Sequence, residues 1–109
     1  MHEEPVFDPE QLDRQTMGDE ALRVEILALF VAEAERLLAQ VEQAPDALVR
    51  ASRLHAMKGL ARNVGARRLA EVCRRVERGV ESGPADKEAL ASLRAAVREA
   101  IDQVHGGFV

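Results

Sequence analysis

The sequence predicts an all-α protein, an antiparallel up-down-up-down four-helix bundle with a short accessory helix at its N-terminal end. Alanine, leucine, glutamate and arginine dominate, and there are three phenylalanines but no tryptophan or tyrosine, a composition that favours helices over strands. Apolar residues recur at helical spacing in four long segments separated by short loops, which favours antiparallel neighbours. A chain of 109 residues is long enough for one core, so residues 1–109 are expected to form a single domain.

Aspartates mark the beginnings of the first two helices. Asp8 can cap a short helix that has Pro9 in its first position and is expected to end before Gly18. Asp19 can cap the next helix, which is expected over residues 19–43. The residues of this helix that we expect to face the core recur at helical spacing: Leu22, Ile26, Leu29, Phe30, Leu37 and Val41.

Three further helices are expected over residues 45–64, 66–82 and 86–104. The first begins with a Pro-Asp pair and ends before Gly65, a residue type common in the left-handed conformation after a helix. The second should end in a turn at residues 82–84, and the Gly-Gly pair after the last helix should fray. The apolar stripes of the last two helices are Leu69, Val72, Cys73, Val76 and Val80, and then Leu90, Leu93, Val97, Ile101 and Val104.

Composition and segment lengths exclude several classes of protein. The longest uninterrupted apolar run covers residues 26–32, far short of the ~20 residues that cross a membrane. His2 is followed by two glutamates, where an export signal would have basic residues before an apolar stretch. Cys73 is the single cysteine, so no internal disulfide can form. We therefore expect a cytoplasmic protein without a membrane segment.

His55 is the histidine that lies within a predicted bundle helix. On a helical wheel its neighbours are small or polar, apart from Leu48. The apolar residues that should face the core lie on the other side of that helix: Leu54, Met57, Ala61 and Val64. His55 is therefore expected to point into solvent. An ordinary exposed histidine without a special role is the plain alternative.

Gly59 and Lys58 make the surroundings of His55 unusual. Glycine inside a helix costs ~1 kcal/mol relative to alanine, and Gly59 lies one turn after His55, where it removes a side chain beside the imidazole. Lys58 places an ammonium group on the same flank, where it can neutralise the charge of an attached phosphoryl group. The alternative for Gly59 is close packing against another helix.

The run from His55 through Lys58 and Gly59 to Gly65, followed by Leu69, Cys73 and Glu77, resembles the histidine-containing phosphotransfer (Hpt) domain. The family pattern is a histidine, any residue, a hydrophobic residue, lysine and glycine, with a Leu…Cys…Glu or Gln run in the next helix. Two residues depart from it. Leu60 stands where serine or alanine is usual, and Arg62 stands where a small residue is frequent.

The resemblance implies a phosphocarrier without kinase activity of its own. It makes His55 the phosphoacceptor through Nε2, Lys58 the cation that neutralises the phosphoryl group and Gly59 the residue that leaves room for a partner. Glu77 would orient the imidazole by accepting a hydrogen bond from Nδ1. The alternative for Glu77 is an ion pair with Arg74 or Arg78.

The same resemblance implies partners rather than cofactors. The partners are the receiver domains of hybrid sensor kinases and response regulators, which supply the phosphorylated aspartate and Mg²⁺. No metal or other cofactor is therefore expected in this chain, and a monomer is expected. The docking surface would surround His55, with an apolar patch and a basic rim: Leu48, Ala51, Ser52, Arg62, Arg74 and Arg78.

Charge is unevenly distributed along the chain. Residues 50–78 contain nine basic and two acidic residues, although the whole chain has a formal net charge of −4. Such a basic region should steer an acidic partner surface toward His55. Binding to nucleic-acid phosphates is the competing explanation. The acidic net charge, the lack of base-stacking aromatic residues and the absence of a helix-turn-helix or zinc pattern argue against it.

Two other functions compete with phosphotransfer. The first is a non-catalytic helical adaptor that binds receiver domains without turnover, against which the intact His55, Lys58 and Gly59 argue. The second is a phosphatase-like helix that hydrolyses the phosphoaspartate of a receiver, a role that does not require an exposed histidine in this pattern.

Overall fold

The structure is a computed structural model that describes residues 4–81 and 87–107, with side chains given up to residue 79 and from residue 87. These residues form five helices and no strand, so the predicted all-α class is confirmed. In chain order the helices are α1 (Pro9–Thr16), α2 (Glu20–Glu42), α3 (Ala47–Val64), α4 (Arg67–Glu81) and α5 (Lys87–His105).

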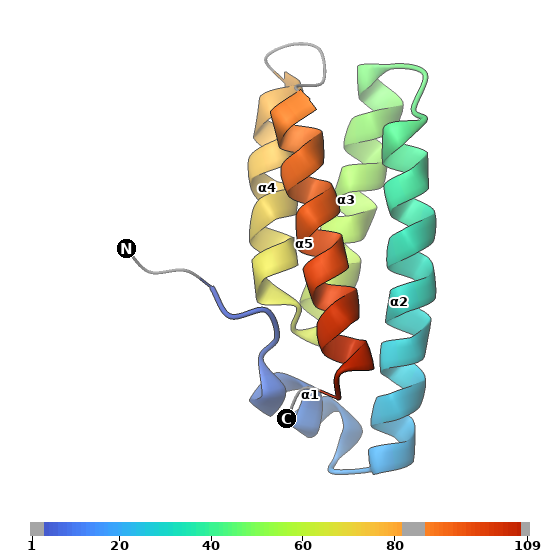
Figure 1. Cartoon of the computed structure of the whole chain (residues 1–109), viewed down its shortest axis with the longest axis vertical. Helices are drawn as coiled ribbons and strands as arrows, with labels where there is room; N and C mark the ends of the chain where they lie inside the picture. The colour runs from blue at the N-terminus through green and yellow to red at the C-terminus, as the bar shows by residue number, and fades with distance from the viewer. Residues whose placement is uncertain (1–3, 82–86, 108–109) are drawn as a thin grey trace.

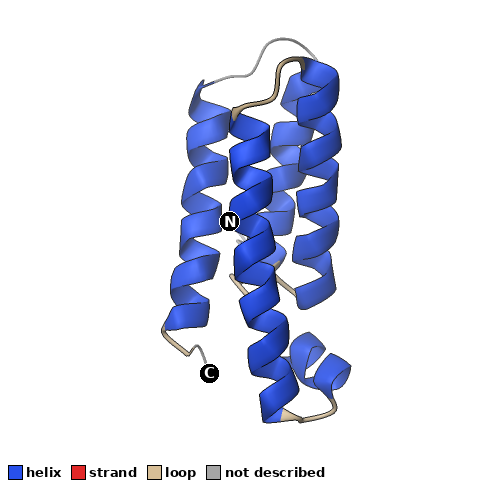
Figure 2. Ribbon diagram, turned by 90° about the vertical axis from the view of Figure 1, so that its right-hand side faces the viewer, coloured by secondary structure: helices blue, strands red, loops and turns tan. Residues whose placement is uncertain are grey.

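Four long helices lie side by side, and α1 lies beneath them next to the beginning of α2 (Figures 1 and 2). Each long helix packs against two others: α2 against α3 and α5, and α4 against α3 and α5. The α2–α5 and α3–α4 pairs therefore lie on opposite sides of the molecule. The outer face of α3 is left uncovered between α2 and α4.

Side-chain caps explain where the helices begin. The carboxylate of Asp19 accepts a hydrogen bond from the Leu22 N–H, and that of Asp46 accepts one from the Val49 N–H. Because Asp46 is extended and acts as the N-cap, α3 begins at Ala47 and not at the preceding proline. Gly65, with φ of 75°, ends α3 in the left-handed conformation.

The buried face of α2 differs from the predicted one. Leu22 and Leu29 were expected in the core, but they are 37% and 65% exposed. Seven residues apart, they share one side of the helix, and this side lies outside the core because the helix is rotated to bury a neighbouring stripe. That stripe consists of Leu27, Phe30, Ala34, Leu37 and Val41, and Ile26 is only partly buried.

The other long helices bury the stripes expected of them. The buried residues are Leu54, Met57, Ala61 and Val64 of α3, Leu69, Val72, Cys73 and Val76 of α4, and Leu93 and Val97 of α5. Leu90, Ile101 and Val104 pack against this core from its edge. The side chain of Val80 and the turn expected at 82–84 lie outside the described residues. The Gly-Gly pair after α5 is hydrogen-bonded to Asp102 and Val104, so it closes the helix instead of fraying.

The N-terminal segment belongs to the same core. Phe7 packs edge-on against Phe30 with ring centroids 5.8 Å apart, and Val6 and Leu12 are buried. The backbone N–H of Asp8 donates to the carbonyl of Gly65 (2.8 Å). This segment is thereby tied to the turn between α3 and α4. Among the described residues, none of the helices is both long and apolar enough to cross a membrane.

Candidate functional site

His55 lies on the uncovered face of α3. Its side chain is 74% exposed, whereas Leu54 and Met57, its neighbours in sequence or in the same turn, are fully buried. The imidazole therefore projects away from the core, as the helical wheel predicts. A partner protein can reach it without any rearrangement of the helices.

Glu77 of α4 lies beside this imidazole and is shared between two α3 side chains. Its Oε2 is 3.4 Å from His55 Nδ1, and its Oε1 is 2.8 Å from Lys58 Nζ. The side chains of Glu77 and Lys58 are only 21% and 15% exposed. Arg74, one of the alternative partners for Glu77, instead donates a hydrogen bond to Glu71 (Nε to Oε2, 3.0 Å).

Lys58 and His55 stabilise the ionised form of Glu77. Partial burial disfavours the carboxylate, but the Lys58 ammonium and the His55 imidazole outweigh this effect, so the pKa of Glu77 is below its ordinary value. Glu77 is therefore an anion at neutral pH and can accept a hydrogen bond from a protonated Nδ1 of His55. The sequence placed Lys58 on the flank of His55 but gave no indication that its ammonium group is held by Glu77.

Gly59 leaves open space beside His55. A Cβ atom built on Gly59 would have no heavy atom within 4 Å beyond its own neighbouring backbone. Packing against another helix therefore does not require glycine here, and that alternative is wrong. The missing side chain leaves a notch on the surface, one turn from the imidazole.

The family follows from a comparison with known domains. The model of the Hpt domain family matches residues 25–107. The chain belongs to the Hpt family. It is a histidine phosphotransfer protein of phosphorelays, in which Hpt domains interact with receiver domains and carry phosphoryl groups instead of acting as kinases.

A solved structure shows the same fold. The crystal structure of histidine-containing phosphotransfer protein B (HptB) from Pseudomonas aeruginosa PAO1 aligns with this Hpt protein with a TM-score of 0.83, over 94% of each chain and at 22% sequence identity. The comparison with curated proteins found no match.

The expected docking residues of this Hpt protein differ in their accessibility. Leu48 is 82% exposed, Ser52, Arg62 and Arg78 are exposed, and Ala51 is half-buried. Arg74 is half-buried and bound to Glu71. Exposure on α3 therefore extends along the helix on both sides of His55, whereas on α4 the guanidinium of Arg74 is held by Glu71.

Cys73 is a buried thiol beneath this site. Burial raises its pKa to about 12, the Glu77 charge contributes to the increase and Lys58 opposes it. Cys73 is fully buried, as expected of a residue in the apolar stripe of its helix. Within the described part of the chain, no group of three histidine, cysteine, aspartate or glutamate residues could hold a metal ion.

The low pKa of Glu77 makes stability depend on pH. The ionised Glu77 carboxylate stabilises the folded state at pH values above 4.5, its ordinary pKa. This stabilisation is lost as the pH falls through the lower pKa that Glu77 has in the folded state. We expect Glu77→Gln to melt at a lower temperature than the wild type at neutral pH, and the difference to shrink below pH 4.5. Thermal melts across this range measure it, and a difference that is independent of pH would contradict the assignment.

Proposed function

We propose that His55 receives a phosphoryl group on Nε2 from a receiver aspartate and passes it to the aspartate of a second receiver. The donor is the receiver of a hybrid sensor kinase, and the acceptor is that of a response regulator. The observation that carries this proposal is the 3.4 Å approach of Glu77 to Nδ1. With Nδ1 turned toward a carboxylate, Nε2 is the nitrogen left for the partner.

The chemistry of each transfer follows from this orientation. A proton on Nδ1 directed at Glu77 leaves the lone pair of Nε2 as the nucleophile. When Nε2 attacks phosphorus, the bond between phosphorus and the aspartate oxygen breaks, and its electron pair remains on the receiver carboxylate. The ring then carries a positive charge that the Glu77 carboxylate stabilises. Transfer onward reverses these steps, and the electron pair of the N–P bond returns to Nε2.

The surrounding residues support this role in different ways. Lys58 neutralises the phosphoryl charge, and Gly59 gives the receiver room to approach. Leu48, Ala51 and Ser52 contribute to the docking surface, with Arg62, Arg74 and Arg78 as its basic rim. Mg²⁺ is assigned to the receiver, and no cofactor is assigned to this chain.

We also propose the arrangement of the helices, the oligomeric state and the cellular location of the protein. The four long helices form an up-down-up-down bundle of one domain, with α1 as an accessory element, which the packing of α2 to α5 supports. The protein acts as a monomer in the cytoplasm, where a free thiol such as that of Cys73 is compatible with reducing conditions.

A transfer assay tests this function. Receiver domains are charged with acetyl phosphate and mixed with the protein, and uncharged receivers are then added. The proposal predicts label on the Hpt protein that is labile to acid and stable to base, and that then leaves for a second receiver. Binding of receivers without any labelling would favour the helical adaptor. Loss of receiver phosphate without phosphohistidine would favour the phosphatase-like function.

Lys58→Ala should slow transfer about tenfold without abolishing it, because a charge-assisted contact to the phosphoryl group is lost while the nucleophile remains. The matched control is Lys87→Ala, which removes an exposed lysine at the start of α5. Single-turnover rates measure the effect, with melting curves to verify folding because Lys58 also binds Glu77. A Lys58→Ala rate equal to that of the control would contradict the role of Lys58.

A further inference from the structure

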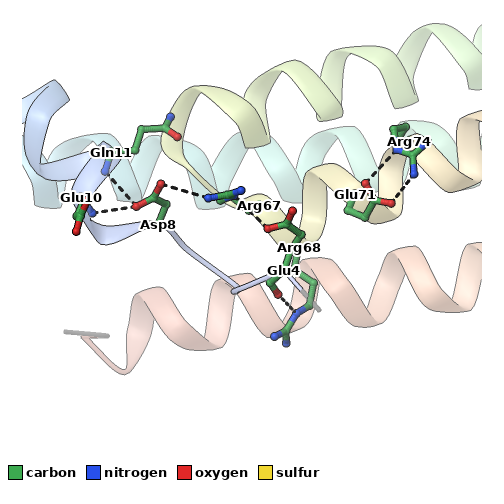
Figure 3. A network of polar contacts seen from close by, with 8 residues as sticks. All are labelled: Glu4, Asp8, Glu10, Gln11, Arg67, Arg68, Glu71 and Arg74. Carbon is green, nitrogen blue, oxygen red and sulfur yellow. Dashed lines mark hydrogen bonds and ion pairs between the residues drawn. The ribbon is translucent and has the colours of Figure 1, made fainter. Parts of the chain in front are cut away.

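A polar pocket lies at the end of the α3–α4 pair, next to the N-terminal segment. Its volume is about 300 Å³, and its walls include Arg62 and Gly65 at the end of α3, Arg67 and Arg74 of α4, and Glu4 and Gln11 of the N-terminal segment. Figure 3 shows Glu4 beside Arg67 and Arg68 of α4, and Gln11 beside the end of α3. Residues 4 and 11 precede the region that the family model matches, which begins at residue 25. The part of the pocket wall that Glu4 and Gln11 form therefore lies outside the region that the family shares.

Hydrogen bonds fix the walls of the pocket. The Gln11 amide donates to the carbonyl of Arg62 (2.7 Å), and the Arg68 guanidinium donates to the carbonyl of Glu4 (2.8 Å). A Cβ atom on Gly65 would lie 3.2 Å from the carbonyl oxygen of Asp8, which shows how closely the segment approaches this turn. The pocket is thus already formed in the free protein, and a ligand need not order it.

Arg62 is the cation of this pocket that is available to a partner. Arg67 contacts Glu4 at 3.2 Å and also lies close to Asp8, and Arg74 is bound to Glu71 (Figure 3). Arg62 is exposed, and no carboxylate of the described residues pairs with its guanidinium. A carboxylate that enters the pocket can therefore pair with the Arg62 guanidinium, whereas the guanidinium groups of Arg67 and Arg74 are already paired with carboxylates.

Arg62 also lies on the same side of α3 as His55. The two residues are seven positions apart, which places them about 10 Å apart along the helix and on nearly the same face. A receiver that brings its aspartate to Nε2 must cover the surface around His55, and an interface of standard size extends over this distance. The pocket is thus continuous with the surface that the proposed function requires.

We propose that this pocket accepts an aspartate or glutamate side chain of the docked receiver domain, and that Arg62 selects receivers that carry it. The inference rests on the proposed function and adds a determinant of partner specificity outside the reacting groups. Arg62 contributes binding energy that is equal before and during transfer, because it does not reach the reacting phosphorus. Its removal should therefore weaken binding of the receiver without slowing the chemical step.

The test compares Arg62→Ala with Arg98→Ala. Arg98 is also an exposed arginine, and it lines a second pocket of about 300 Å³ between α2 and α5, on the opposite side of the molecule. The probe is the receiver, charged with acetyl phosphate, that labels the wild type fastest. We expect Arg62→Ala to raise about tenfold the receiver concentration that gives half-maximal single-turnover transfer, with the maximal rate unchanged, and Arg98→Ala to change neither.

Charge reversal provides the second arm. Arg62→Glu should weaken transfer further, and replacing one acidic residue of the receiver by lysine should restore it. Equal half-saturating receiver concentrations for Arg62→Ala and Arg98→Ala, or a fall in the maximal rate instead, would overturn the inference while leaving the relay intact. If no phosphorylated receiver labels the wild type, the proposed function is overturned, and this inference with it.

Discussion

The His55→Ala variant is expected to fold like the wild type and to accept no phosphoryl group. The side chain is 74% exposed, so its removal should change the free energy of unfolding by no more than about 0.5 kcal/mol. Glu77 keeps its contact with Lys58 at 2.8 Å, so no buried charge is left without a partner. Melting curves and labelling by a charged receiver measure the two effects on the same sample.

The control for this variant is His105→Ala. The last helix was predicted to end at residue 104, but α5 extends to His105, which is exposed. It therefore offers a second accessible imidazole on a helix, without a matching lysine and glycine. Full labelling of His105→Ala and none of His55→Ala is the predicted pattern, and labelling that persists in His55→Ala would remove His55 from the central role.

Gly59 is expected to show opposite effects on stability and on transfer. Gly59→Ala should stabilise the protein by about 1 kcal/mol, because alanine favours the helix interior and its Cβ meets open space. Gly59→Gln should keep the fold but slow transfer by about a hundredfold or more, since a displacement of the reacting atoms by 1 Å can cost that much. Melting curves and single-turnover transfer rates measure both effects.

Gly79 supplies the matched control. It also lies inside a helix, in α4, and a Cβ atom built there also meets nothing within 4 Å. Gly79→Gln should therefore transfer phosphoryl groups at the wild-type rate. If Gly59→Gln were as fast as Gly79→Gln, the space beside His55 would have no role in the approach of a receiver.

Local sequence patterns sufficed for the elements in which neighbours along one helix decide the outcome. Helical periodicity alone places His55 on the exposed side of α3 and Met57 on the buried side, and both are found there. The left-handed Gly65 was likewise predictable from the residue type. These features depend on contacts within three or four residues in the chain.

The same reasoning failed where the position depends on how two helices pack. In α2 nearly every turn carries an apolar residue, so the pattern is compatible with more than one buried stripe, and Leu29 was assigned to the wrong one. The contact of Glu77 with both Lys58 and His55 depends on the register of α4 against α3. The spacing of residues within one helix does not predict how α4 is placed against α3. The family pattern nevertheless pointed to Glu77.

The pocket beside Arg62 was not foreseen for a similar reason. Gln11 and Arg62 are 51 positions apart, yet the Gln11 amide donates to the Arg62 carbonyl. The residues of the N-terminal segment carried a signal for a short capped helix but none for its place in the fold. The contacts of Phe7 and Gln11 with the rest of the chain become visible only in three dimensions.

The central claim is that the phosphoryl group is carried on Nε2 of His55, and nuclear magnetic resonance of the ring nitrogens tests it most directly. The chain contains three histidines, so protein labelled with ¹⁵N-histidine gives three separable rings. After incubation with a charged receiver, we predict coupling to phosphorus at Nε2 of His55 alone, with the proton retained on Nδ1. A phosphoryl group on Nδ1, or on either of the other histidines, would contradict the account.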